Sequence, residues 1–288
     1  MNNLIFISLL SLFIAILSPF LGMIFLIAIG GSFIVKKGYQ GKEILFLTLL
    51  IGLGLLNLFG VIAVPDMFEV FGGIVVVAWM TLSSFFKDKD FTKAFYIGSI
   101  WQLGYGVARW GLLKQTLTER IDLVFSGYEK LMQTEKLFSS MNEEQVIMML
   151  EQVKSMMLNY QIAIWSISMI LALYVGIHLL ARRTGLSWNH QNMRLPNWIV
   201  YLLIITLILA VIPTLRTFGL NCLFSIIVLF VIQGLAIIDF WSKKFLHRSK
   251  FILFAATFLM FINILFALFI ALLGFSDYWL DIRGLNRS

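Results

Sequence analysis

The sequence has few charged residues, a single cysteine and no familiar enzyme motif. Charged residues fill 13% of its 288 positions, whereas soluble domains carry roughly 25%. The single cysteine, Cys222, excludes a disulfide within the chain, and the three histidines lack the spacing of metal ligands. The motifs of zinc proteases, phosphate-binding loops and serine hydrolases are also missing. We therefore predict a protein that is not an enzyme and that uses no metal and no cofactor.

The chain is instead rich in long apolar runs. Hydrophobic residues make up 60% of it, and a run of about 17 to 25 apolar residues is long enough to cross a bilayer as a helix. The continuous run 199–212 lacks the alternation of a barrel strand. The composition predicts an all-α fold, namely a polytopic transmembrane helical bundle of eight or nine spans.

The boundaries of the expected helices follow from these runs and from the prolines. The first run, residues 4–35, is too long for one ordinary span, and Pro19 interrupts it because proline lacks the N–H that a helix interior needs. Eight spans result if this run is one bent element, and nine if it forms two helices. The predicted helices cover residues 4–17, 19–35, 44–63, 65–86, 94–113, 160–181, 197–215, 217–241 and 251–275.

The positive charges lie mainly in short loops between the apolar runs. The formal net charge is +7, and Lys and Arg in short loops are typical of the cytoplasmic side of a membrane protein. The basic loops are 36–42, 87–93, 182–198 and 243–250. This pattern predicts a multi-pass protein of the bacterial cytoplasmic membrane, surrounded by lipid, and it argues against nucleic-acid binding.

One long polar stretch, residues 114–159, divides the chain. It predicts an extracytoplasmic helical hairpin between an N-terminal membrane half, 1–113, and a C-terminal membrane half, 160–276, with a short tail at 277–288. The apolar face of the hairpin packs on the membrane domain or on itself, or it docks a protein partner. The hairpin is also a candidate lid over the outer half of the bundle. The face comprises Leu117, Ile121, Val124, Tyr128 and Leu131 at helical spacing.

Polar side chains in the outer half of the membrane form the candidate ligand site. Such side chains are costly in a bilayer and mark a cavity or a helix contact. Gln102 and Arg109 share one face of the helix 94–113. Three uses of Arg109 stay open, because it could extend to the surface, pair with Glu69, or hold a carboxylate or phosphate of a small-molecule ligand. The candidate set is Asn57, Glu69, Ser99, Gln102, Tyr105 and Arg109.

Three segments of the C-terminal half carry a resemblance to a known family. They are Met193-Arg194-Leu195-Pro196-Asn197-Trp198, Gln233-Gly234-Leu235-Ala236, and the stretch LGFSDYWLDIR from Leu273 to Arg283. These segments resemble the YybS-like family of bacterial membrane proteins, a domain of unknown function. That family is distantly similar to the S components of energy-coupling-factor transporters and to the cell-shape protein MreD.

The resemblance implies two different roles. Similarity to S components implies a bundle that binds a small molecule and works with a membrane coupling protein, which S components dock through an Ala-xxx-Ala face. The nearest match to that face is Ser11 and Ala15. Similarity to MreD implies a scaffold that recruits partners through the hairpin and the loop containing Arg194 and Trp198. We predict a transporter-like substrate-binding or accessory subunit without its own ATPase, with a non-catalytic scaffold as the alternative.

Overall fold

The computed structural model describes residues 2–37, 40–135, 143–246 and 249–284, and within them the chain is helical with no strand. The N-terminal helices are α1 (Asn2–Leu17), α2 (Pro19–Phe25), the π-helical η1 (Leu26–Gly30), α3 (Gly31–Lys37), α4 (Gln40–Leu58), α5 (Val64–Val70), the π-helical η2 (Phe71–Val75) and α6 (Val76–Asp88). The later ones are α7 (Phe91–Glu135), α8 (Glu143–Asn159), α9 (Gln161–Thr184), the short η3 (His190–Asn192), α10 (Trp198–Val211), η4 (Pro213–Leu215), α11 (Arg216–Leu246), α12 (Ser249–Ile262) and α13 (Ile264–Leu280).

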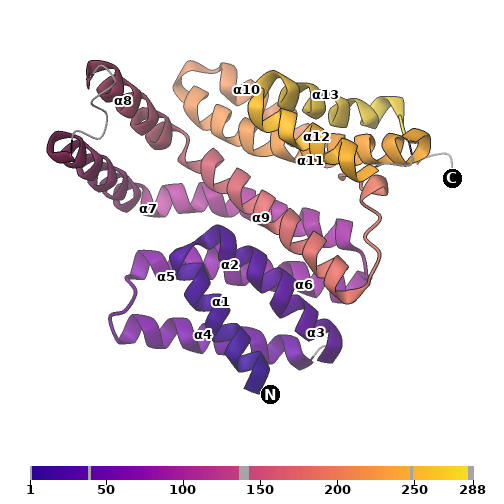
Figure 1. Cartoon of the computed structure of the whole chain (residues 1–288), viewed down its shortest axis with the longest axis horizontal. Helices are drawn as coiled ribbons and strands as arrows, with labels where there is room; N and C mark the ends of the chain where they lie inside the picture. The colour runs from indigo at the N-terminus through magenta and orange to yellow at the C-terminus, as the bar shows by residue number, and fades with distance from the viewer. Residues whose placement is uncertain (1, 38–39, 136–142, 247–248, 285–288) are drawn as a thin grey trace.

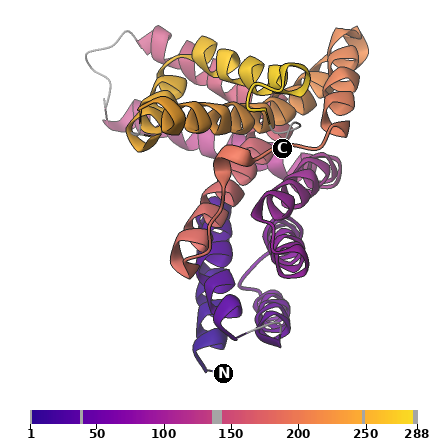
Figure 2. The same cartoon turned by 90° about the vertical axis from the view of Figure 1, so that its right-hand side faces the viewer.

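Most of the helices extend between the two sides of the view in Figure 1, and α1, α2 and α9 do so obliquely. The hairpin of α7 and α8 lies at one end, which we call the hairpin end. Basic residues lie in the last turns of α6, α9 and α11, and these turns lie at the opposite end, the basic end (Figure 1). Figure 2 looks along the horizontal of Figure 1 and shows α10–α13 on one side of the molecule and α1–α6 on the other.

Five helical stretches in the described part of the chain are long and apolar enough to cross a membrane. They are Pro19–Lys36, Gly41–Leu58, Val64–Asp88, Gln161–Thr184 and Pro213–Lys244. Asn3–Leu17, Trp198–Val211 and Ile264–Leu280 are apolar but shorter. The all-helical membrane fold is therefore confirmed, whereas the count of eight or nine spans stays a prediction.

Two breaks within apolar sequence set the course of the chain. The expected break at Pro19 is confirmed, since Ser18 is extended and its side chain accepts a hydrogen bond from the Leu21 amide. The single helix expected over 251–275 is wrong. It divides at Asn263, which has φ −133° and ψ 111° and caps α13 by accepting from the Leu265 amide at 2.9 Å. The extended backbone at Asn263 lets α13 turn back toward the basic end (Figure 1).

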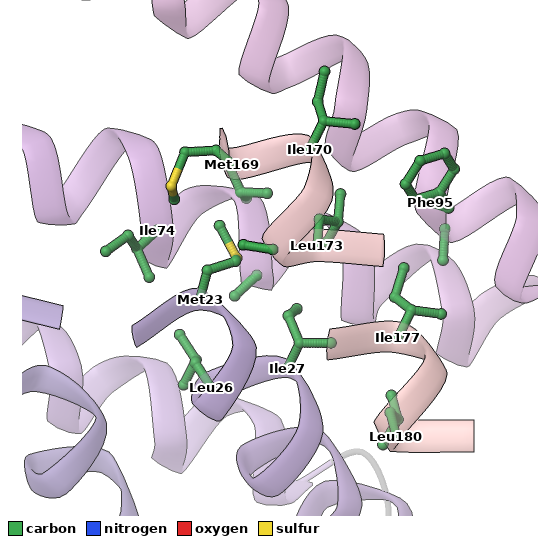
Figure 3. Packing of buried hydrophobic residues seen from close by; sticks show 14 of the residues in the cluster. Met23, Leu26, Ile27, Ile74, Phe95, Met169, Ile170, Leu173, Ile177 and Leu180 are labelled. Atoms are coloured by element: carbon green, nitrogen blue, oxygen red, sulfur yellow. The ribbon is translucent and has the colours of Figure 1, made fainter. Parts of the chain in front are cut away.

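Helix α9 is the centre of the hydrophobic core. It packs against α2, η1 and α3 on one side and against α7 and α11 on the others. Figure 3 shows Met169, Leu173 and Ile177 of α9 facing Met23 of α2 and Ile27 of η1. All five side chains are almost fully buried. The polar hairpin divides the sequence, but this helix joins its two halves in space.

Helix α7 is one continuous helix of 45 residues. At 1.5 Å per residue it is about 68 Å long, roughly twice the thickness of the hydrocarbon core. The boundary expected at residue 113 is therefore not a break in the chain. The second half of α7 projects from the hairpin end and pairs with α8, and residues 136–142 lie outside the described residues.

Helices α11 and α13 approach so closely that their contact requires glycine. A Cβ atom on Gly234 would lie 2.1 Å from the carbonyl oxygen of Ile270, and one on Gly274 would lie 2.1 Å from the carbonyl oxygen of Phe230. Small residues at such crossings let the backbones of membrane helices touch. Each glycine therefore fits against a carbonyl of the opposite helix, which fixes the position of α13.

Candidate functional site

The central ion pair of the hairpin end joins Glu69 of α5 to Arg109 of α7. Nε and Nη2 of Arg109 both donate to Oε1 of Glu69, at 3.0 and 2.7 Å. The two side chains are 12% and 11% exposed. Of the three uses left open for Arg109, the structure shows the pairing with Glu69, which supplies each charge with a partner in a poorly solvated place.

A second arginine, Arg120, extends this ion pair toward the hairpin. Its Nη2 lies 2.8 Å from Oδ1 of Asp66, and its Nη1 lies 3.8 Å from Oε2 of Glu69. Arg120 was not among the predicted site residues, because it belongs to the polar stretch assigned to the hairpin. The available signal was its spacing, since 11 residues are three helical turns and place it on the face of Arg109.

The predicted polar residues of α7 reach the backbone of the α5–η2–α6 helix. Gln102 donates to the carbonyl of Gly73 at 2.6 Å, and Tyr105 donates to that of Phe68 at 2.7 Å. A π-helical turn disrupts the regular backbone pairing of a helix and is frequent at functional sites. A Cβ atom on Gly72 would lie 2.2 Å from the Tyr105 ring. The glycines of η2 thus leave room for the side chains of α7 to reach backbone carbonyls of this helix.

Trp165 of α9 closes the inner side of this cluster. The guanidinium of Arg109 lies 4.3 Å from the centre of the Trp165 ring, which is cation–π stacking distance. The indole N–H of Trp165 points to Oε1 of Gln102 at 3.3 Å. Arg109 is therefore held between a carboxylate and an aromatic face, so its position is fixed before any ligand arrives.

A cavity of about 370 Å³ opens beside this cluster. It lies between the α1–α2 turn, α7, α9 and the base of the hairpin, and volumes of this size suit small molecules. Its lining combines two arginines with mainly apolar side chains: Ser18, Pro19, Phe20, Arg109, Leu117, Arg120, Ile121, Met157, Gln161, Ile164, Trp165, Ser168 and Met169.

One buried polar group in the cavity wall has no partner. Gln161, in the first turn of α9, is 7% exposed. Its Oε1 finds no hydrogen-bond donor in the described part of the chain. Buried amide groups are normally paired, because an unpaired one costs about 1 to 3 kcal/mol. A bound molecule that donates a hydrogen bond to Oε1 of Gln161 would therefore supply the missing partner.

Of the six predicted site residues, only Arg109 lines the cavity. Glu69, Gln102 and Tyr105 belong to the cluster around Arg109, whereas Asn57 and Ser99 belong to neither. Asn57 donates to the carbonyl of Ile62 at 3.1 Å and so closes the turn after α4. Ser99 is completely buried, and its Oγ has no partner among the described residues.

The hairpin lies directly over this cavity. Leu117 and Ile121 of α7 and Met157 of α8 form part of its wall. Lys154 of α8 lies 2.7 Å from Asp122 of α7, and the hydrogen bond to that carboxylate raises the pKa of Lys154. This contact ties α8 to α7 where the two helices leave the bundle, so the base of the hairpin belongs to the site.

The predicted partner-binding residues differ in their accessibility. Ser11 and Ala15 are 1% and 2% exposed. Ser11 donates to the carbonyl of Ile7, and Ala15 contacts the backbone of Gly22. This small-residue face is packed within the chain, and its role in docking a partner stays a prediction. Trp198 is 41% exposed and remains accessible.

The three segments that carried the family resemblance meet at one place. Gln233 accepts from the Leu195 amide at 3.0 Å and donates to the Gly274 carbonyl at 2.9 Å. Tyr278 donates to the Leu195 carbonyl at 2.8 Å. Arg283 pairs with Asp277 at 2.6 Å and donates to the carbonyls of Gln191 and Met193. The tail expected from residue 277 therefore begins later, since α13 continues to Leu280 and Asp277 is buried.

A family model described as "Predicted membrane protein (DUF2232)" matches residues 5–278. The chain belongs to this family. The match extends from α1 into the last helix and includes both the cavity at the hairpin end and the three converging segments. No curated protein and no solved structure matches the chain. Membership of this family and the apolar helices agree on an integral membrane protein in contact with the lipid bilayer.

Proposed function

We propose that the protein binds a small amphipathic molecule with an anionic group in the cavity beneath the hairpin. It would act as a transporter-like substrate-binding or accessory subunit in a bacterial cytoplasmic membrane. The observation that carries this proposal is the unpartnered Oε1 of Gln161 in the same cavity wall as Arg109 and Arg120.

The arginines favour an anionic group on the ligand. Arg109 uses Nε and Nη2 for Glu69, and a guanidinium carries five N–H donors. Arg120 is 39% exposed, and its contact with Glu69 is long, at 3.8 Å. A carboxylate or phosphate would gain two charge-assisted contacts here. A hydroxyl or amine on the same ligand would satisfy Oε1 of Gln161.

The remaining wall favours an apolar body. Phe20, Met157, Trp165 and Met169 contribute aromatic rings and thioethers, and flexible methionines adapt to ligands of different shapes. Binding sites of this kind are mostly apolar with a few placed polar groups. The ligand class that fits is a carboxylate or phosphate monoester that has an alkyl or aromatic body and a hydroxyl or amine group for Gln161.

The proposal is tested with the full chain purified in detergent. The probes are carboxylates and phosphate monoesters that carry an alkyl or aromatic group and a hydroxyl or amine, and the readouts are thermal shift and native mass spectrometry. We expect one probe class to bind, and Arg120→Gln to weaken it by about tenfold or more, since one charge-assisted hydrogen bond is lost.

The matched control is Arg216→Gln, which removes an exposed arginine near the hairpin end but outside the cavity lining. It should leave binding unchanged. The proposal fails if no probe binds, or if the control weakens binding as much as Arg120→Gln does.

A scaffold role is the second candidate, and the surface of the hairpin supports it. Leu123 is 73% exposed and Met149 is 63% exposed. Both lie on the projecting hairpin, and apolar patches on such a segment mark interaction sites. Photo-crosslinkers at these two positions should capture a neighbouring membrane protein that a crosslinker at the exposed, polar Glu151 does not capture. An absence of any protein neighbour would remove this alternative.

A further inference from the structure

A second cavity lies at the basic end of the molecule and is mainly polar. Its volume is about 420 Å³. One wall is the α6–α7 turn, and the other is the loop that follows α9. The lining residues are Lys89, Asp90, Phe91, Thr92, Ser187, Trp188, Asn189, Asn192 and Arg194. Nothing in the proposed ligand site at the hairpin end involves these residues.

Lys89 is held in place at the first wall. It follows α6 in the left-handed conformation, with φ 55°, and its amide donates to the carbonyl of Phe85 at 2.7 Å. Its ammonium lies 4.9 Å from the centre of the Phe86 ring. An aromatic ring attracts a cation without carrying a net charge. The lysine is therefore positioned but not neutralised by this contact.

Asp90 is the one carboxylate among the described residues of the cavity lining, and it is engaged at the start of α7. Its Oδ1 accepts from the amides of Thr92 and Lys93, at 2.7 and 3.2 Å. These amides open α7, where the helix dipole is positive and stabilises a carboxylate. The Asp90 carboxylate thus caps the helix and keeps its charge, and the lining carries two cationic side chains against this one anion.

The second wall is fixed by contacts on both of its sides. Trp188 donates to Oγ1 of Thr92 at 3.4 Å, which joins the loop to the first wall. The buried Arg283 holds the carbonyls of Gln191 and Met193 at 2.7 and 2.8 Å. The guanidinium of Arg194 lies 5.9 Å from the Tyr278 ring. Asn189, Asn192 and Arg194 are therefore presented on a braced loop.

We propose that this basic cavity binds a phosphate group, with Lys89 and Arg194 as the charged contacts and the amides of Asn189 and Asn192 as neutral donors. Two fixed cations on facing walls suit a doubly charged oxyanion, since arginine offers planar donors and lysine a point charge. The lining offers a metal cation only one carboxylate, that of Asp90, and this carboxylate already caps α7. The lining therefore suits an anion better than a metal ion. The phosphate belongs either to a lipid headgroup or to a free anion.

Two sets of probes distinguish the sources. For the lipid source, native mass spectrometry of the full chain compares retention of phosphatidylglycerol and cardiolipin with that of phosphatidylcholine, whose headgroup has no net charge. For the free source, thermal stability is followed during titration with inorganic phosphate and pyrophosphate, with sodium chloride at equal ionic strength as the reference.

The variants use the conformation of Lys89. Asparagine tolerates the left-handed region, so Lys89→Asn removes the charge while keeping the turn. It should weaken binding of the recognised probe by about tenfold or more, whereas Lys89→Arg should retain it. The matched control is Arg183→Asn, an exposed basic residue of the same end that does not line the cavity. It should leave binding unchanged.

A second variant guards against a folding defect in Lys89→Asn. Asn192 is exposed, so Asn192→Asp keeps the shape of the side chain and adds a negative charge to the lining. It should also weaken binding while leaving the probe-free unfolding midpoint unchanged. Binding of either a lipid headgroup or a free phosphate supports the site if Lys89→Asn and Asn192→Asp weaken it and the control does not. The site is refuted if no probe binds, or if Arg183→Asn lowers binding as much as Lys89→Asn does, because that result would indicate general attraction to the basic end.

Discussion

Two buried ion pairs, one near each end of the membrane domain, use the same chemistry in different surroundings. Asp277 and Arg283 are 1% and 0% exposed, and Arg283 also binds two loop carbonyls. Glu69 and Arg109 are 11% and 12% exposed, and a cavity opens beside the arginine. The Arg283 cluster is enclosed by protein, whereas the Arg109 cluster has one open side.

This difference separates a structural role from a binding role. Breaking a sealed pair leaves an uncompensated charge that no water can reach. Breaking a pair beside a cavity leaves a charge that water, a ligand or a neighbouring side chain can partly compensate. The Arg283 cluster should therefore dominate stability, and the Arg109–Arg120 cluster should dominate ligand binding.

The largest effect is expected from Arg283→Met. It leaves Asp277 buried without its cation and frees the carbonyls of Gln191 and Met193. The free energy of unfolding in mixed micelles should fall by about 3 to 5 kcal/mol. The double variant Asp277→Leu with Arg283→Met should recover part of this loss, because no unpaired charge remains. An unchanged stability of Arg283→Met would contradict the structural role of this pair.

Gly234→Ala should be the next most destabilising change. Its new Cβ atom would meet the Ile270 carbonyl, a backbone group that cannot rotate away. Overpacking of this kind costs about 1 to 3 kcal/mol, measured by the same unfolding experiment. Gly104→Ala is the matched control, since no atom lies within 4 Å of its added Cβ. Equal effects of the two changes would disprove the close contact of α11 and α13.

Glu69→Gln should have a smaller effect than either change near the basic end. The amide oxygen can keep both hydrogen bonds from Arg109, but the substitution removes the counter-charge. We expect a loss of about 1 to 2 kcal/mol, together with tighter binding of an anionic probe to the uncompensated arginine. Unfolding and probe titration on the same variant check both statements. Weaker probe binding would contradict an anion site at Arg109.

Arg120→Gln should have the smallest effect on stability. Its pair with Asp66 is 39% and 38% exposed, and exposed pairs contribute under about 1 kcal/mol. The same variant should reduce probe binding more than Arg283→Met or Gly234→Ala does, because Arg120 lies in the cavity wall. A large loss of stability in the unfolding experiment would show that Arg120 has a structural role, and it would contradict the distinction between the two clusters.

Local chemistry predicted part of this arrangement from the sequence. Pro19 predicts the helix break because proline lacks the N–H that a helix interior needs. The similar depth of Arg109 and Glu69 in the membrane suggested their pairing as one alternative, since charged side chains within a bilayer are usually paired. Composition predicted the helical membrane fold, because so much apolar surface cannot be buried in a soluble chain of this length.

The missing parts depend on contacts between distant segments. The break at Asn263 lies within an apolar run that would also suit a continuous helix. Arg283 finds its carbonyl partners 90 and 92 residues earlier. The open space beside Gln161 depends on how α1, α7 and α9 pack, which helical spacing within one segment does not specify. The cavity therefore appears only in three dimensions.

The most direct test is an experimental density map of the full chain in lipid nanodiscs, prepared with the tightest-binding probe. The account predicts non-protein density between Arg120, Gln161 and Trp165, with its anionic group at the arginine and a donor at the Gln161 oxygen. The opposite result is a cavity closed by the side chains of Phe20 and Met157, with Arg120 directed wholly at Asp66. That result would make the cluster a structural contact and contradict the proposed binding function.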